Sequence, residues 1–334
     1  MDRGLGMALH LVALLIGAVL DLAIGDPHGF VHPVRWMGSF IERFQRVLAR
    51  AGLIGAGPRR ERIAGLLLVS ATLGLFGGAT AALVVAAGAV SWQLQLAVEA
   101  VASYYCLAAR SLFDESMRVF RALREGSLED ARRAVSMIVG RDTASLDRAG
   151  VCRAAVETVA ENACDGVVAP LFYLALLGPV GGVCYKAVNT LDSMVGYRNE
   201  RFVHLGRAAA KLDDAANFVP ARITGALMCA AAFLPGFDAA RARRVFARDR
   251  LLHASPNSAH GESACAGALG VRLAGDAVYA GVRVEKPFIG DDVRPIEPED
   301  IRRANVLMLA TAAQALALFA GAVEVLRALG CYPG

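Results

Sequence analysis

The chain has 334 residues, of which 56% are hydrophobic and 20% are charged. This apolar share exceeds that of an ordinary soluble domain, so the composition predicts an integral membrane protein. The formal net charge is only +4, and the basic residues are interspersed with acids. That pattern argues against a nucleic-acid-binding surface, and nucleic acid is not expected as a partner.

Long apolar runs are the main structural signal along the chain. The run from Ile63 to Val98 carries no charged residue, and about 20 apolar residues of helix suffice to cross a bilayer. We predict a single membrane-embedded domain over residues 1–334, an all-α integral membrane protein. It would be a polytopic bundle of about four to six membrane-embedded helices with cytoplasmic helical segments. Its hydrophobic segments are expected near residues 7–22, 63–88, 89–109, 167–185, 223–237 and 305–323.

Charged segments indicate which side of the membrane each part faces. Residues 23–62 and 110–166 are rich in arginine, which favours the cytoplasmic side. A full crossing at 167–185 would put residues 186–222 on the opposite side. Because 223–237 is short for a span, at about 22 Å of helix, we favour a re-entrant or partly buried pair made of these two runs. Ordinary crossings are the alternative.

Local signals predict a helix, a bend and a hairpin. Asp142, Thr143 and Asp147 suit the start of a helix that runs from about Leu146 into Asn162. Gly178 and Pro179 interrupt an apolar run at its middle, which predicts a bend or a helical hairpin there. Residues 271–290 are the least helical part of the chain and are expected to form a short β-hairpin over the functional site.

Three carboxylates recur at a spacing of four residues around the end of that helix. Glu157, Glu161 and Asp165 would share one helical face, with Asn162 beside them. Like charges at this spacing repel, and Mg²⁺ bound to carboxylate and phosphate oxygens would remove the penalty. An exposed acidic stripe paired with arginines is the alternative. Arg141, just before the helix, is a candidate phosphate contact.

The segment from Lys186 to Arg222 concentrates polar groups between two apolar runs. Lys186 and Arg222 are candidate phosphate contacts, although interfacial anchoring explains the lysine on its own more simply. The oxygen-bearing side chains of this segment would hold a magnesium–phosphate unit. They are Asn189, Thr190, Asp192, Ser193, Asp213, Asp214 and Asn217.

A glycine- and proline-rich turn follows the first apolar run, in the sequence GDPHGFVHPVRWMG. It carries Asp26, His32 and Arg35, and an arginine at the membrane boundary can hold a phosphate or carboxylate through two parallel hydrogen bonds. We include the three residues among the predicted substrate-binding groups. A plain interfacial loop is the alternative.

A second turn, in HASPNSAHGESACAGALG, carries Ser255 and Asn257 as predicted binding residues. The small residues after it predict a helix that allows close backbone approach, either to a ligand or to a neighbouring helix. The segment Tyr279 to Lys286 is interpreted as a solvated hairpin rather than as part of the site.

The chain contains, in order, the motifs HPVRWMG, ENACDGVVAP, YKAVNTLDSMVGY, KLDDAANFVPAR and SPNSAHGESACAGALGVRL. Together they resemble the successive motifs of adenosylcobinamide-phosphate synthase, a family of membrane-bound proteins of cobalamin biosynthesis. The resemblance runs from about Leu22 to Gly290. The chain departs from the family pattern after Ser-Pro-Asn, so the resemblance assigns no role to residues 258–263.

The resemblance implies a ligase that uses ATP and Mg²⁺. It would join a propionate carboxylate of adenosylcobyric acid to (R)-1-amino-2-propanol O-phosphate and give adenosylcobinamide phosphate, through an acyl phosphate. It also implies a multi-pass protein of the bacterial inner membrane, surrounded by lipid, whose site faces the cytoplasm. A homo-oligomer, or contact with later enzymes of the cobalamin pathway, is compatible with this expectation.

Residue chemistry suggests how the motifs would divide the work of such a reaction. The expected metal ligands are Asp165, Asp192, Asp213, Asp214 and Asn217. The expected catalytic groups are Asp165, Lys186, Asp192, Asp214 and Glu161. Glu157, Glu161 or His32 would take the proton of the amine.

Three other functions remain open at this stage. A magnesium-dependent membrane transferase acting on a phosphorylated or diphosphate substrate would use aspartate clusters equally well, without consuming ATP. A non-enzymatic signalling relative would not need the motifs intact. A transporter would need charged groups within the membrane, for which Glu99 and Glu324 are the candidates.

Overall fold

The computed structural model describes residues 3–26, 32–197, 199–279 and 281–330 of the chain. Helix makes up 74% of the structure, so the chain is an all-α polytopic membrane protein with a few short strands. The described chain forms two compact units, and each is described below by itself. Unit 1 comprises residues 1–107, 169–217 and 318–334, and unit 2 comprises residues 108–168 and 218–317.

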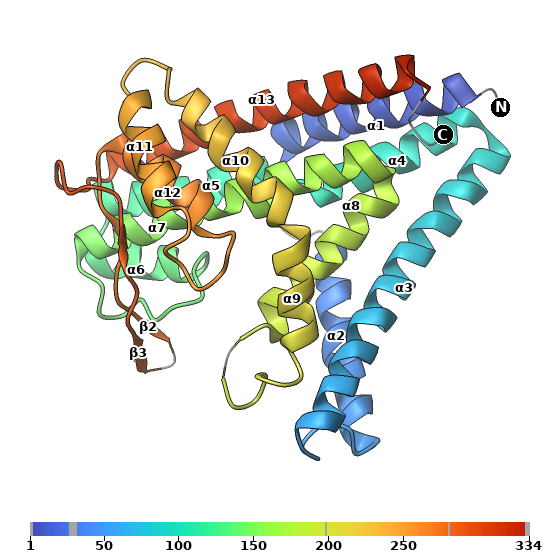
Figure 1. Ribbon diagram of the computed structural model, residues 1–334, viewed down its shortest axis with the longest axis horizontal. Helices are drawn as coiled ribbons and strands as arrows, with labels where there is room; N and C mark the ends of the chain where they lie inside the picture. The colour runs from blue at the N-terminus through green and yellow to red at the C-terminus, as the bar shows by residue number, and fades with distance from the viewer. Residues whose placement is uncertain (1–2, 27–31, 198, 280, 331–334) are drawn as a thin grey trace. The chain divides into compact units, whose positions relative to one another are not determined.

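Unit 1 is built mainly from helices (Figure 1), and an apolar core joins the second, the third, the eighth and the ninth of the chain. The core joins Ile41, Leu68, Leu191, Leu205 and Ala209, all of which are buried. The helices are α1 (Arg3–Ile24), α2 (Pro33–Arg50), α3 (Pro58–Val90), α4 (Trp92–Cys106), α8 (Ala169–Val195), α9 (Arg207–Ala216) and the end of α13 (Glu299–Ala328).

A buried charge links α1 to α4 within unit 1. The side chain of Glu99 is fully buried and pairs with His10 of α1. Gln95 donates a hydrogen bond of 2.7 Å to the same carboxylate. Gly17 lets the two helices approach closely, since a Cβ atom there would lie 2.6 Å from Cβ of Ser103. Glu99, a candidate intramembrane charge, is thus held by partners from both helices.

Helix α8 bends where the sequence predicts a break. Gly178 has φ 64° and ψ −163°, a conformation outside the helical region, and Pro179 follows it. Glycine adopts positive φ without the steric penalty of a side chain, so it can make this bend. The polar residues from Lys186 onward lie on the segment after the bend.

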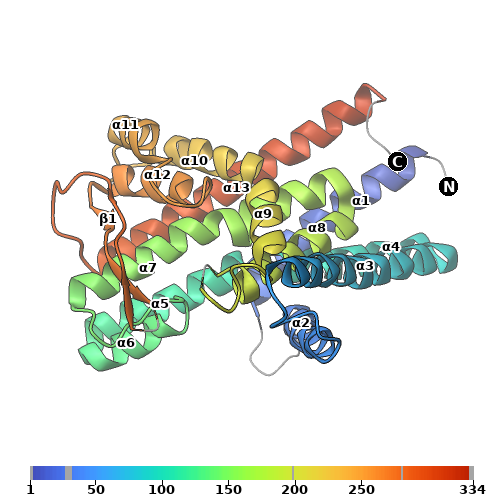
Figure 2. The same ribbon diagram turned by 60° about the horizontal axis from the view of Figure 1, so that its bottom comes forward.

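Unit 2 packs short helices around one helix made of small residues. All of α12 is buried, and Gly267 lies so close to α11 that a Cβ atom would be 2.7 Å from Cα of Ala242. The sequence left open whether these small residues face a ligand or a helix, and here they pack against α11, which lies beside α12 in both views (Figure 1 and Figure 2). The helices are α5 (Ala109–Glu125), α6 (Leu128–Ser136), α7 (Arg148–Asn162), the π-helical η1 (Ala163–Val168), α10 (Phe218–Ala231), α11 (Ala239–Asp249), α12 (Ala259–Leu269) and the first part of α13.

Helix α7 begins as the sequence predicts. Asp147 is its N-cap residue, and its carboxylate accepts a hydrogen bond of 2.7 Å from the backbone N–H of Gly150. Such a cap satisfies one of the four N–H groups that a helix leaves unpaired at its start. The helix then runs to Asn162, the predicted end.

The predicted β-hairpin is also present in unit 2. Strands β2 (Ala277–Tyr279) and β3 (Val282–Val284) pair antiparallel, with Tyr279 opposite Val282. Strands β1 (Leu273–Ala274) and β4 (Phe288–Ile289) form a second antiparallel pair at the base of the hairpin.

The expected segments 7–22, 63–88, 167–185 and 305–323 lie within helical stretches. The segment 89–109 is interrupted at Ser91 and at Leu107, and the segment 223–237 extends beyond the end of α10 at Ala231. The helical stretches Pro58–Val90, Trp92–Glu125, Arg148–Val195 and Glu299–Ala328 are long and apolar enough to cross a membrane. Leu9–Ile24 and Phe218–Ala231 are apolar but shorter. On α3, Leu83, Val85 and Val90 are 61%, 72% and 75% exposed, as expected of side chains that contact lipid. The re-entrant pair, and the side of the membrane that each polar segment faces, stay predictions.

Candidate functional site

The first cluster of predicted site residues lies in unit 1, between α8 and α9. The Tyr185 hydroxyl donates a hydrogen bond of 2.8 Å to Oδ1 of Asn217. The amide of Asn217 donates in turn at 3.0 Å to Oδ2 of Asp213, one turn earlier. The motifs YKAVNTLDS and KLDDAANF, far apart in the sequence, are therefore joined by direct contacts.

The carboxylates of this cluster influence one another. Burial raises the pKa of Asp213 to about 7, and the carboxylate of Asp192 adds to the rise, while the Asn217 amide opposes it. Asp214 contributes a further, smaller rise. Oδ1 of Asp213 is buried and has no hydrogen-bond partner within the described residues. A carboxylate in such a place is stabilised in its charged form by a cation.

The same carboxylates are candidate ligands for Mg²⁺. Within the described residues, no three His, Cys, Asp or Glu side chains converge in a way that could hold a metal ion. Magnesium in phosphate-binding sites commonly takes only one or two carboxylates and completes its shell with waters and phosphates. Asp192 and Asp213, with the unpaired oxygen of the latter, fit that arrangement rather than an all-protein cage. Of the five expected ligands, Asp165 belongs to unit 2 and the other four to unit 1.

His32, at the start of α2, lies within electrostatic reach of Lys186. His32 is the N-cap of α2, and its Nδ1 accepts a hydrogen bond of 3.2 Å from the N–H of Val34. Its Nε2 lies 3.6 Å from a carboxylate oxygen of Asp26. Burial lowers the pKa of His32, the Asp26 carboxylate opposes this, and the positive charge of Lys186 lowers it further. The structure thus brings the HPVR motif within electrostatic reach of Lys186.

The remaining predicted residues of unit 1 differ in what they offer. Thr190 donates its hydroxyl hydrogen at 2.7 Å to the carbonyl of Lys186, and Ser193 donates at 2.9 Å to that of Asn189. Both hydroxyl groups therefore donate within α8 and keep only their acceptor sites for a ligand. The side chain of Arg35 is exposed and makes no ion pair with the described residues. Its guanidinium is therefore accessible to an anionic ligand.

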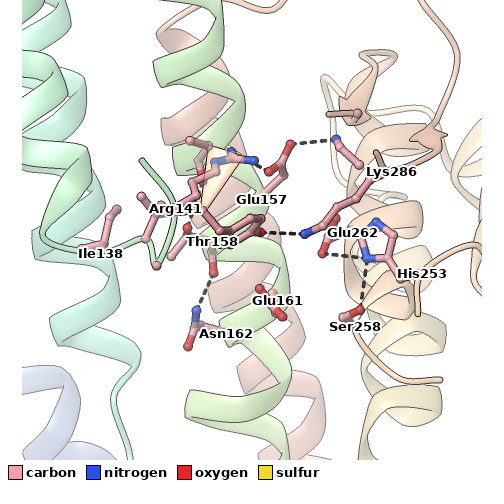
Figure 3. A pocket seen from close by; sticks show the side chains of 16 residues that line it. Ile138, Arg141, Glu157, Thr158, Glu161, Asn162, His253, Ser258, Glu262 and Lys286 are labelled. Carbon is pink, nitrogen blue, oxygen red and sulfur yellow. Dashed lines mark hydrogen bonds and ion pairs between the residues drawn. The ribbon is translucent and has the colours of Figure 1, made fainter. Parts of the chain in front are cut away.

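The second cluster surrounds a cavity of about 210 Å³ in unit 2 (Figure 3). The guanidinium of Arg141 pairs with Glu157 at 2.7 Å, and both side chains are nearly buried. The other carboxylate oxygen of Glu157 accepts a hydrogen bond of 2.7 Å from the N–H of Ala274, at the base of the hairpin. Glu161 and Asn162 also line the cavity, so three predicted site residues, Arg141, Glu161 and Asn162, meet there.

Asp165 lies in the π-helical η1, just beyond the end of α7. The prediction that it shares one helical face with Glu157 and Glu161 stays a prediction. Glu157 and Glu161 line the cavity, whereas Asp165 is not among the described residues around it.

Arg222, Ser255 and Asn257 form a third group, also in unit 2. Arg222 donates at 3.3 Å to Oδ1 of Asn257 and lies over the ring of Phe218, with 3.5 Å from Cζ to the ring centroid. The backbone N–H of Asn257 donates at 3.3 Å to the hydroxyl of Ser255. The predicted turn therefore contacts Arg222 through the side-chain oxygen of Asn257.

Sequence reasoning missed part of the cavity wall. Glu262 and His253 line it, and so do Tyr279 and Lys286, which were interpreted as parts of a solvated hairpin. That interpretation is wrong for these two side chains, because Lys286 donates at 2.7 Å to the hydroxyl of Tyr279 beside the cavity. A sequence signal for Glu262 exists, since it is the single acid in a helix of small residues.

Two of these groups have strongly shifted ionisation. Burial raises the pKa of Glu262 well above its usual range, with Glu161 and Glu157 adding to the rise, and Lys286 and Arg141 opposing it. Burial lowers the pKa of His253 to about 4, and Lys286 contributes. At neutral pH the imidazole is therefore uncharged. Such shifts are common in functional sites and also occur in structural networks.

Comparison with known proteins now adds to this geometry. The model of the CobD/Cbib protein family matches residues 14–308, which include both clusters. The chain belongs to the CobD/CbiB family. Three relatives illustrate the similarity, with the shares of this chain and of the relative covered. "Cobalamin biosynthesis protein CobD" of Pelobacter propionicus is 47% identical, over 89% of this chain and 90% of the relative. The protein of the same name from Klebsiella pneumoniae is also 47% identical, over 94% and 97%. "Cobalamin biosynthesis protein CbiB" of Salmonella typhi is 43% identical, over 94% and 98%.

No solved structure matches the chain. The residues of the two clusters fall inside the region that the family model covers, including Glu262 and Lys286, which the motifs did not single out.

Proposed function

We propose that this chain is an ATP-dependent amide ligase of cobalamin biosynthesis. It joins a propionate carboxylate of adenosylcobyric acid to (R)-1-amino-2-propanol O-phosphate and produces adenosylcobinamide phosphate. The main support is the half-buried carboxylate cluster of Asp192, Asp213 and Asp214, in a chain whose relatives are named cobalamin biosynthesis proteins. The protein acts in the inner membrane of a bacterium with its site toward the cytoplasm, and association into oligomers or with later enzymes of the pathway is part of the proposal.

The chemistry requires activation of a carboxylate, which is a poor acyl donor. Transfer of the terminal phosphoryl group of ATP gives an acyl phosphate and ADP. The amine nitrogen then attacks the acyl carbon, and the bond to the phosphate oxygen breaks. The substrate ammonium gives up two protons in all, one before attack and one afterwards. One of them leaves with the phosphate as hydrogenphosphate, and the other passes to a protein base or to water.

The residues of the chain supply charges rather than a nucleophile. Asp192 and Asp213 would hold Mg²⁺, which neutralises phosphate charge when bound. Lys186 and Arg35 bind phosphate oxygens, with His32 held near them by the α2 N-terminus. The other predicted residues are proposed to act as the catalytic, metal-binding or substrate-binding groups named in the sequence analysis. They are Asp26, Arg141, Glu161, Asn162, Asp165, Asn189, Thr190, Ser193, Asp214, Asn217, Arg222, Ser255 and Asn257.

The experiment that tests this proposal is a coupled assay on the full chain in detergent. Purified protein is incubated with adenosylcobyric acid, the amino alcohol phosphate, ATP and Mg²⁺, and ADP and amide product are both measured. We expect equal amounts of the two. Asp214→Ala should abolish turnover without loss of membrane insertion, whereas Glu200→Ala, which changes an exposed acid of the same unit, should leave it intact.

Two results would contradict the proposal in different ways. Wild-type turnover in Asp214→Ala would remove the carboxylate cluster from the reaction. Product without ATP consumption would exclude a ligase and favour the magnesium-dependent transferase, since aspartate clusters bind diphosphates as readily as a magnesium–ATP unit.

A further inference from the structure

The cavity of unit 2 contains a carboxyl group that accepts no hydrogen bond from the described part of the chain. The side chain of Glu262 is 5% exposed. Within the described residues its one polar contact is to Nδ1 of His253 at 3.7 Å, which is too long for a hydrogen bond. Buried polar groups are nearly always hydrogen-bonded, and an exception calls for a ligand or another explanation. Figure 3 shows Glu262 and His253 together on the side of the cavity opposite Arg141.

His253 cannot supply the missing positive charge. Its Nδ1 lies 3.1 Å from the hydroxyl of Ser258, and its Nε2 is buried without a hydrogen-bond partner within the described residues. The ring is neutral at pH 7, because burial lowers its pKa to about 4. Glu262 therefore faces a neutral imidazole.

The charges that line the cavity do not balance. Three carboxylates, those of Glu157, Glu161 and Glu262, face two cations, Arg141 and Lys286. Arg141 is engaged by Glu157, and Lys286 donates to Tyr279. Burial and the neighbouring Glu161 and Glu157 raise the pKa of Glu262, so its charged form lacks a compensating cation among the described residues of the cavity. A ligand with a positively charged group would stabilise that form.

The size of the cavity limits what can enter. Its volume is about 210 Å³, below the range of about 300–1,000 Å³ for sites that enclose drug-sized ligands. A corrinoid or a nucleoside triphosphate is too large to fit in a cavity of this volume. A molecule of a few carbons with an ammonium group is of suitable size.

We propose that this cavity binds the ammonium group of the amino alcohol phosphate, with Glu262 as its main contact and Glu161 as the second. The inference rests on the proposed ligase function and adds to it the place where the amine is held. An ammonium has three N–H donors, which can serve both carboxylates and the unpaired nitrogen of His253. It also gives the buried carboxyl the positive partner that the described residues do not provide.

The test is a binding measurement that separates the ammonium from the phosphate. Isothermal titration calorimetry is carried out on the full chain in detergent with (R)-1-amino-2-propanol O-phosphate and with (R)-1,2-propanediol 2-phosphate, in which a hydroxyl replaces the amino group. Glu262→Gln keeps the shape of the side chain and removes its charge. We expect its Kd for the amine to rise at least tenfold, about 1.4 kcal/mol, and its Kd for the nitrogen-free analogue to stay as in the wild type.

Matched variants keep the result interpretable. Glu285→Gln changes an exposed acid next to Lys286 and should bind both compounds as the wild type does. Glu161→Gln, on a different helix, should repeat the effect of Glu262→Gln and serves as the test if that variant does not fold. Wild-type amine affinity in both cavity variants would overturn the inference, and so would an equal loss for the two compounds.

The ligation assay, run on the same preparations, separates the two proposals. If the wild type makes the amide and the cavity variants bind the amine normally, the inference fails and the proposed function stands. If the wild type neither makes the amide nor binds the amine, the proposed function fails, and the inference with it.

Discussion

The hydroxyl of Tyr185 on α8 donates a hydrogen bond of 2.8 Å to the side-chain oxygen of Asn217, just after α9. This contact orients the Asn217 amide, which donates to Asp213. The Asn217 amide therefore links Tyr185 of α8 to the carboxylate of Asp213. The position of Asp213 depends on that chain of two hydrogen bonds.

We expect Tyr185→Phe to disturb the site more than the fold. Loss of one hydrogen bond typically costs about 1 kcal/mol, so the thermal midpoint should fall by a few degrees. The concentration of Mg²⁺ needed for half-maximal ligation should rise severalfold, because Asn217 no longer holds Asp213. Tyr173→Phe, which removes a hydroxyl bonded to the Ala216 carbonyl at 2.9 Å, is the matched control. An unchanged magnesium requirement in Tyr185→Phe would contradict this expectation.

Gly196 lies against the carboxylate of Asp192. A Cβ atom at this position would be 2.7 Å from both Cγ and the carbonyl oxygen of Asp192, closer than side chains tolerate. Gly196→Ala should therefore displace that carboxylate and reduce ligation at least tenfold, as measured by product formation. Gly74→Ala is the control, since nothing lies within 4 Å of its Cβ position and alanine favours the helix. Equal activity of the two variants would argue against a functional position for Asp192.

The pair of Arg141 and Glu157 should behave as a buried salt bridge. Removal of one partner leaves an uncompensated charge and is expected to cost about 3 kcal/mol. Arg141→Met and Glu157→Gln should each lower the thermal midpoint, and the double variant should lose less than the sum of the two. Glu157→Gln should also speed proteolysis near the hairpin, because its carboxylate holds the N–H of Ala274. Additive losses would show that the two charges do not interact.

The buried side chain of His260 should lower the free energy of unfolding in acid. Burial lowers its pKa to about 4, Arg222 and Arg250 contribute, and the Asn257 backbone opposes the change. Both ring nitrogens are buried without hydrogen-bond partners within the described residues. Since the folded protein binds the proton less readily than the unfolded chain, stability is full above pH 6.5 and declines between pH 6.5 and about 4.

The loss attributable to His260 should be at most about 3 kcal/mol, at ~1.4 kcal/mol per pKa unit. His260→Leu should flatten this part of the profile, measured as the thermal midpoint in detergent from pH 7.5 down to pH 4.5. It should change the midpoint little at neutral pH, because the ring packs edge-on against Phe246 in an apolar setting. A variant profile parallel to that of the wild type would refute the assignment.

Much of the fold follows from sequence signals with a local physical cause. Apolar runs gave the helices, Asp147 gave the start of α7, and Gly178 gave the bend in α8. The π-helical turn at residues 163–168 did not follow, because such a turn depends on surrounding contacts rather than on the period of apolar residues. The motifs predicted the cluster of Asp192 and Asp213 well, since its two halves are each short and polar.

The cavity of unit 2 was harder to predict. Glu161 and Arg141 were found from their spacing and charge, but Glu262 lies where the chain departs from the family pattern. Lys286 belongs to a short hairpin whose surroundings are set by pairing between strands and by the hydrogen bond from Ala274 to Glu157. Such long-range contacts leave no mark in the local sequence.

The pairing of Glu99 with His10 also bears on how the protein enters the membrane. A single carboxylate at the centre of a lone spanning helix costs about 2.5–3.5 kcal/mol during insertion. Helix α4 meets that cost with groups from itself and from α1, because Gln95 and His10 both contact Glu99. We expect α4 to be held in the bilayer only once α1 is already there. Insertion of α4 then depends on α1, and deletion of α1 should leave α4 outside the membrane during synthesis.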